Sequence, residues 1–197
     1  MKKIFCLLIV FLSLSVFAQK NKQTTSDSIS SPIFAKKNEI KIDVLNFIGN
    51  GRLGISYERF LNNNFSIGIS GLTFNKASKV DNFINDDTRT MIEYQIIPYV
   101  RYAMSKSASN LYYIETFANI NGGQFKELTT LNTGGIDYIL VTKNDYNDLA
   151  LGASIGYKLY FKECFVLDLT VGIGKNLFNN NSPSTISRLG LNLGYRF

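Results

Sequence analysis

Apolar and polar residues alternate with a period of two from Glu39 to the carboxyl end of the chain. The final segment, RLGLNLGYRF, shows this pattern most clearly. Its odd positions are all apolar or aromatic, and its even positions hold only arginine, asparagine and glycine. Successive side chains of a β-strand point to opposite faces, so the pattern predicts strands with one apolar and one polar face. We find no segment with the 3.6-residue period of an amphipathic helix.

Eight segments carry the alternation, and the connections between them differ in length. The segments span residues 39–48, 52–61, 65–74, 90–103, 111–121, 148–161, 165–175 and 188–197. The connections are short at 62–64, 105–110 and 162–164, and longer at 75–89, 122–147 and 176–185. A strand that crosses a bilayer at a steep tilt needs about 9–11 residues, and short turns opposite long loops are typical of outer-membrane barrels. We therefore expect an all-β fold over residues 39–197. It is an eight-stranded antiparallel up-and-down transmembrane β-barrel with short periplasmic turns and longer extracellular loops.

The distribution of aromatic residues and glycines assigns the two faces. Aromatic residues on the apolar face flank the short turns or the carboxyl end, and they are Phe65, Tyr102, Tyr112, Phe161, Phe165, Tyr195 and Phe197. Such rings gather at the membrane interface, so they predict an outward aromatic girdle. The polar face is rich in glycine and serine, which suits the narrow interior of an eight-stranded barrel.

Charged residues on the polar face cluster near the short turns. Those expected to form one layer in the lumen are Glu58, Arg101, Glu115, Lys158, Asp168 and Arg196, whereas Glu93 and Arg188 are expected far from them. Enclosed charges are costly unless paired, so we predict a salt-bridged network that plugs the lumen. A polar relay or ligand site is the alternative.

Pro98 conflicts with its position inside the fourth segment, because a barrel has no edge strand to accommodate a missing N–H. We predict a β-bulge at Pro98. Pairing that stays regular on both sides of it would contradict the register that we assign.

The amino-terminal region predicts export. Two lysines, an apolar run and small residues before Gln19 are typical of a signal peptide spanning 1–18, and the polar residues 19–38 predict a flexible periplasmic leader. Removing the signal peptide lowers the formal net charge from +6 to +4. The remaining basic residues are scattered, so nucleic acid is not an expected partner. Cys164 is then the only cysteine, which excludes an internal disulfide.

The carboxyl end resembles the signal by which outer-membrane proteins are recognised by their assembly machinery. The matching residues are Leu189, Leu191, Leu193, Tyr195 and Phe197. Together with NEIKIDVLNFI and GISYERFLNNNFSIGIS, this ending is similar to the small outer-membrane barrels common in Bacteroidota, a domain-of-unknown-function family with an OmpA-, OmpX- or OmpW-like architecture. The resemblance implies location in the outer membrane, with lipid and the barrel-assembly machinery as partners.

The absence of histidine bears on enzymatic function. Enzymes built on this architecture resemble one another in using histidine as the base, whose pKa suits proton transfer near neutrality. We therefore expect no enzyme, no catalytic residue, no cofactor and no metal site.

These expectations favour a non-enzymatic outer-membrane barrel with a plugged lumen. It would act in envelope integrity or surface interaction through loops 75–89 and 122–147. A narrow conduit or binding barrel for a small or apolar solute is the alternative, and a soluble periplasmic ligand-binding barrel is a third hypothesis.

Overall fold

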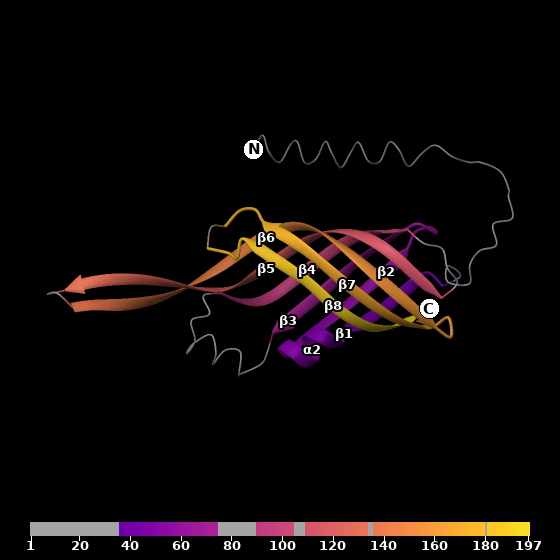
Figure 1. Cartoon of the computed structure of the whole chain (residues 1–197), viewed down its shortest axis with the longest axis horizontal. Helices are drawn as coiled ribbons and strands as arrows, with labels where there is room; N and C mark the ends of the chain where they lie inside the picture. The colour runs from indigo at the N-terminus through magenta and orange to yellow at the C-terminus, as the bar shows by residue number, and fades with distance from the viewer. Residues whose placement is uncertain (1–35, 75–89, 105–108, 134–135, 180) are drawn as a thin grey trace, which may run out of the picture.

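The computed structural model describes residues 36–74, 90–104, 109–133, 136–179 and 181–197. The described part forms one closed barrel in which each strand pairs antiparallel with its neighbours in sequence and the last strand pairs with the first (Figure 1). The strands are β1 (Asn38–Asp43), β2 (Arg52–Phe60), β3 (Phe65–Phe74), β4 (Thr90–Ala103), β5 (Asn110–Thr133), β6 (Ile136–Phe161), β7 (Phe165–Asn176) and β8 (Thr185–Arg196). The expected antiparallel up-and-down barrel of eight strands is confirmed. The predicted signal peptide, the predicted leader up to residue 35 and the predicted loop 75–89 lie outside the described residues.

The carboxyl-terminal strand closes the barrel. β8 pairs with β1 from Asn192↔Asp43 to Arg196↔Glu39. Beyond the strand, the backbone N–H of Asn38 donates to the carbonyl of Phe197 at 3.0 Å, and the N–H of Phe197 donates back at 2.9 Å. Because β8 pairs with β1, neither strand has an unpaired edge. In an open sheet, the backbone donors and acceptors of both strands would be exposed along one side.

The two faces of the sheet have the polarity expected from the alternation. Apolar side chains point outward, and Ile155 is 64% exposed and Leu193 52% exposed. Glu58, Lys158 and Asp168 point inward and are fully buried. The barrel therefore has an apolar outer surface around a polar lumen. Among the described residues, no helix has the length and apolar character needed to cross a bilayer.

The first strand is shorter than expected. We predicted a strand over 39–48, but β1 ends at Asp43 and the helix α2 (Val44–Asn50) follows. The carboxylate of Asp43 caps the helix by accepting from the N–H of Asn46 at 2.9 Å. Gly51 ends it in the left-handed conformation, with φ of 63°, where glycine carries no steric penalty. Two local capping signals thus override the alternation.

The segment 122–147 is a β-hairpin and not the loop that we predicted. β5 and β6 stay paired as far as Thr133↔Ile136. By contrast, pairing with β4 ends at Phe125 of β5, and pairing with β7 ends at Ala150 of β6. The outer part of the hairpin projects beyond the barrel, at the end opposite the carboxyl terminus (Figure 1).

The predicted bulge at Pro98 is wrong. Pairing with β3 is regular through Ile69↔Pro98. On the other side, pairing with β5 is interrupted at Ile97 and Pro98 and continues beyond them in the same register. The register shift in this pair of strands lies elsewhere, between Ile92 and Tyr94. The missing N–H of proline therefore removes pairing on one side of the strand without inserting an extra residue. The pairing is regular on the β3 side alone, and Pro98 points outward.

Candidate functional site: the lumen

Inward-pointing charged side chains meet in the lumen and form what we call the charged layer. Its members are Glu39, Lys41, Glu58, Arg101, Glu115, Lys158, Asp168, Arg188 and Arg196. All six residues that the sequence placed in the lumen belong to it. The strands β1, β2, β4, β5, β6, β7 and β8 each contribute at least one member, so the layer crosses the whole section of the barrel.

Glu58 and Asp168 occupy the centre of the charged layer. The Glu58 carboxylate accepts from Lys41 at 2.5 Å, from Nη1 of Arg101 at 2.7 Å and from Lys158 at 2.8 Å. Asp168 accepts from Lys41 and from Arg101, each at 2.8 Å. Charge-assisted hydrogen bonds of this length are among the stronger contacts in proteins. They compensate for the removal of these groups from water.

The charged layer extends to both sides of this centre. On one side, Glu115 is shared, because it accepts at 2.7 Å from Nε of Arg101 and at 2.7 Å from Nε of Arg188. On the other side, Glu39 accepts from Lys158 at 2.7 Å and lies 3.7 Å from Nε of Arg196. The Nε of Arg196 also donates to the backbone carbonyl of Lys36 at 2.8 Å.

Sequence reasoning omitted three members of the layer. Glu39 and Lys41 lie on the polar face of the first segment, so the alternation itself could have identified them. Arg188 was expected far away, and its ion pair with Glu115 corrects that expectation. Barrel strands are tilted and staggered, so distance along a strand does not give height in the lumen. Glu93 is exposed and joins no ion pair among the described residues.

Aromatic rings fill the space around the charged layer. The guanidinium of Arg101 lies 4.5 Å from the ring centre of Tyr99 and 4.2 Å from that of Tyr113. The hydroxyl of Tyr113 donates to Asp168 at 2.6 Å. A Cβ placed on Gly156 would overlap the Tyr113 ring and lie 2.6 Å from the carbonyl oxygen of Leu169. This inward glycine is therefore required by packing.

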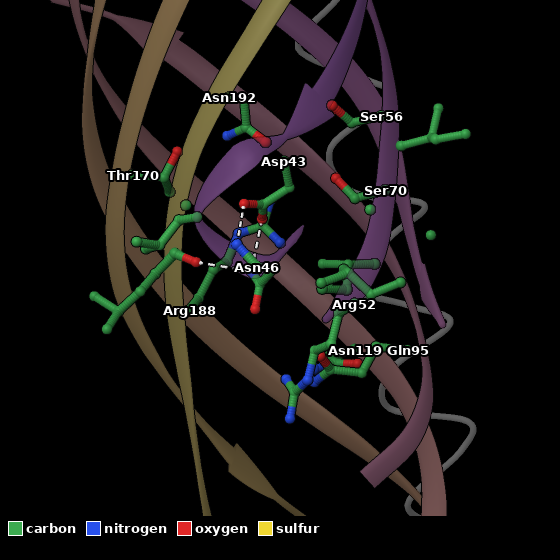
Figure 2. Close-up of a pocket in the computed structure, with 18 of the residues that line it drawn as sticks. Asp43, Asn46, Arg52, Ser56, Ser70, Gln95, Asn119, Thr170, Arg188 and Asn192 are labelled. Atoms are coloured by element: carbon green, nitrogen blue, oxygen red, sulfur yellow. Dashed lines mark hydrogen bonds between the residues drawn. The ribbon is translucent and has the colours of Figure 1, made fainter. Parts of the chain in front are cut away.

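A cavity of about 160 Å³ lies on the α2 side of the charged layer, and we call it the polar cavity. Figure 2 shows polar side chains around it, contributed by β1, α2, β2, β3, β4, β5, β7 and β8. The lining includes Asp43, Asn46, Arg101, Asn119, Arg188 and Asn192. Asn46 is fixed at its edge, because its side-chain amide donates to Asp43 at 2.7 Å and to the carbonyl of Leu189 at 3.4 Å.

The seven aromatic residues predicted to form a girdle are all exposed on the outer face. Two cross-strand pairs bring four of them into contact. The ring centres of Phe65 and Tyr102 lie 5.1 Å apart, and those of Phe165 and Tyr195 lie 5.8 Å apart. The residues matching the assembly signal lie on β8 or directly after it, with their side chains on the apolar face. That role stays a prediction.

Cys164 lies in the turn between β6 and β7. Its sulfur accepts a hydrogen bond from Nζ of Lys36 at 2.7 Å, across 128 positions of sequence. This hydrogen bond raises the pKa of Lys36, with burial acting in the opposite direction. The contact ties the segment before β1 to the β6–β7 turn. Among the described residues, no three His, Cys, Asp or Glu side chains converge as ligands for a metal ion.

Comparison with known proteins shows the fold. No family model matches this chain, and no curated protein matches it significantly. The attachment invasion locus protein Ail of Yersinia pestis is a structural neighbour with a TM-score of 0.43 and 12% identity over 82% of this chain and 99% of that chain. Neisserial surface protein A has a TM-score of 0.44 and 15% identity over 81% of this chain and 93% of that chain.

A further neighbour gives a higher score. The N-terminal β-barrel domain of Pseudomonas aeruginosa OprF has a TM-score of 0.53 and 13% identity over 82% of this chain and 98% of that chain. At this level of identity the likeness concerns the fold alone, and the resemblance to a Bacteroidota family stays a prediction. The chain shares the β-barrel fold of the OprF N-terminal domain.

Proposed function

We propose that this protein is a non-enzymatic integral outer-membrane barrel with a plugged lumen, acting in envelope integrity or in interactions at the cell surface. The observation that carries the proposal is the charged layer, which spans the lumen with buried ion pairs. Opening a path through it would separate buried charges from their partners, at a cost of several kcal/mol.

The outer surface supports location in a membrane. Exposed apolar side chains cover every strand of the barrel, with aromatic rings gathered at the short-turn end. Soluble proteins rarely expose an apolar surface of this extent. Outer-membrane lipid is thus the proposed partner of the outer face, and the assembly machinery is the proposed partner of β8 during insertion. Fractionation of cells and heat-modifiable gel mobility of the extracted protein test this location.

The charged layer also argues against catalysis. Each of its four carboxylates is engaged by at least two cationic side chains, as Glu115 is by Arg101 and Arg188. A carboxylate held in this way is not available as a general base, and the chain offers no histidine to replace it.

Conductance across planar bilayers tests the plug. We expect the full-length protein, folded in detergent and inserted into a bilayer, to show small or no conductance at physiological salt. A variant with Arg101→Ala and Lys158→Ala, which removes two cations from the centre of the layer, provides a positive control for detecting leakage. A stable open pore in the unchanged protein would contradict the proposal.

The projecting hairpin is the proposed surface-interaction element, together with loop 75–89. Its outer strands pair only with each other in the described part of the chain, so each presents an unpaired edge of backbone donors and acceptors. The hairpin can be shortened without changing the register below, because Lys126 pairs directly with Lys143. We would join these two residues through an Asn-Gly turn, which preserves the ladder below. Loss of binding to envelope components or host surfaces, with unchanged permeability, supports the proposal. Unchanged binding contradicts this role.

A second candidate function is a binding barrel for a small solute. The polar cavity favours it, because the cavity is enclosed by the barrel wall and by α2 yet is not filled by side chains.

A further inference from the structure

The polar cavity contains a buried amide with no partner. Asn119 on β5 is 1% exposed, and neither its side-chain nitrogen nor its side-chain oxygen is hydrogen-bonded to any described group of the protein. A buried polar group without a partner costs about 1–3 kcal/mol. The side chain lines the cavity, as Figure 2 shows. It therefore presents a donor nitrogen and an acceptor oxygen to whatever occupies this space.

Two guanidinium groups lie at the floor of the cavity. Arg101 and Arg188 both line the cavity, and both are bonded to the same carboxylate, that of Glu115. Arg101 is also bonded to Glu58 and Asp168, so its charge is shared with three carboxylates. Arg188 donates to Glu115 alone, through Nε and Nη2, and its Nη1 makes no hydrogen bond among the described residues. The Nη1 group is therefore left to meet an anionic acceptor in the cavity.

The remaining lining is made of neutral hydrogen-bonding groups. Ser56, Ser70, Gln95 and Asn192 face the cavity. Such groups suit a solute that carries hydroxyl groups beside its charge, because they both donate and accept. A binding pocket of this kind combines a small number of placed polar groups with a preformed shape.

We propose that the polar cavity binds a small hydroxycarboxylate with a single negative charge. Its carboxylate lies against Arg188 and accepts from the Asn119 amide nitrogen, and its hydroxyl donates to the Asn119 oxygen. This arrangement gives Nη1 of Arg188 an acceptor and satisfies both atoms of the orphaned amide. It goes beyond the plugged barrel, because the ligand enters from the α2 side and need not cross the charged layer.

Lactate and its neutral analogue propane-1,2-diol provide a matched pair of probes, and propionate and chloride test the hydroxyl and the carboxylate separately. Binding is measured on the full chain folded in detergent micelles, by calorimetry and by the NMR shift of the Asn119 side-chain amide. We expect saturable binding of lactate, at least tenfold weaker binding of propionate and of chloride, and no binding of propane-1,2-diol. Absence of lactate binding, or equal binding of any of the other three, would overturn the proposal.

Three variants locate the site. Arg188→Gln removes the charge and should weaken lactate binding about tenfold or more, since a hydrogen bond to a charged group contributes about 1.5–3 kcal/mol. Asn119→Leu should abolish the binding. Lys175→Gln, an exposed position on β7, is the matched control and should leave binding unchanged. Heat-modifiable gel mobility establishes that each variant is folded. Unchanged lactate binding in folded Arg188→Gln or Asn119→Leu would overturn the assignment of the site to the polar cavity. Open-pore conductance of the unchanged protein would contradict the plugged lumen and not this site.

Discussion

The two parts of the lumen share most of their strands but differ in how their buried polar groups are paired. At the centre of the charged layer, Glu58 accepts hydrogen bonds from Lys41, Arg101 and Lys158. Two nitrogens of Arg196, at the far side of the layer, have no hydrogen-bond partner among the described residues. In the polar cavity, Asn119 makes none within the described structure. Both regions are buried and polar, so burial alone does not determine how completely a group is satisfied.

Inward glycines show the same difference. Beside the charged layer, a Cβ on Gly156 would overlap the Tyr113 ring. At the polar cavity, a Cβ on Gly190 would meet only the Asn192 amide nitrogen, at 3.0 Å, with all other atoms at 3.8 Å or more. At Gly156 the layer is thus packed against a rigid ring, whereas at Gly190 the cavity is bordered by a side chain that can move. This contrast suits one region for closing the barrel and the other for accepting a ligand.

The largest effect is expected from breaking the charged layer. Glu58→Gln keeps the shape of the side chain but leaves Lys41, Arg101 and Lys158 without their shared carboxylate. Removing one partner of a buried ion pair typically costs about 3–5 kcal/mol, so we expect the free energy of unfolding to fall by about that amount. Urea titration in detergent micelles, followed by the heat-modifiable gel shift, measures it.

The control for this prediction is Glu163→Gln in the β6–β7 turn, where the side chain is exposed. Surface substitutions of this kind change stability by about 0.5 kcal/mol or less. If the two variants were equally stable, the charged layer would contribute little to the fold, and the contrast with the cavity would lose its energetic basis.

A smaller effect is expected from adding one methyl group to each region. Gly156→Ala forces the Tyr113 ring or the Leu169 backbone to move, and such overpacking costs about 1–3 kcal/mol. Gly190→Ala displaces only the end of the Asn192 side chain, so we expect a change within about 0.5 kcal/mol. Unfolding of both variants under the same conditions tests the comparison directly. Equal losses would show that both regions are packed to the same density.

The alternation of the sequence predicted the barrel and its faces because one rule, period two, applies to every strand. It assigned Ile155 outward and Lys158 inward without any knowledge of pairing. It failed where a local signal dominates. The run from Val44 to Asn50 is too short to show a helical period, yet the cap at Asp43 and the glycine at position 51 determine its conformation.

Contacts between strands were harder to predict. Arg188 reaches Glu115 across the lumen, although 73 positions separate them and their strands are not adjacent. The stagger of the strands determines which residues lie at the same height in the lumen. The alternation of apolar and polar residues does not encode this stagger. The polar cavity was not predictable at all, because an unfilled volume depends on the packing of all the side chains that surround it.

At the edge of the polar cavity, where α2 is capped, we expect a smaller effect than from Glu58→Gln or Gly156→Ala. Asp43→Ala removes the acceptor for the N–H of Asn46, at 2.9 Å, and for the Asn46 side-chain amide, at 2.7 Å. Loss of an N-cap costs about 0.5–2 kcal/mol, and the cost falls on the helix because the charged layer does not depend on Asp43. We therefore expect faster hydrogen exchange over Val44–Asn50, with unchanged exchange in β6 and β7. Asp43→Ser restores a capping oxygen and should recover most of the protection. Uniformly faster hydrogen exchange across the barrel would contradict a local role for this cap. Such a result would mean that α2 and the charged layer unfold as one unit, and that the two parts of the lumen are not energetically separate.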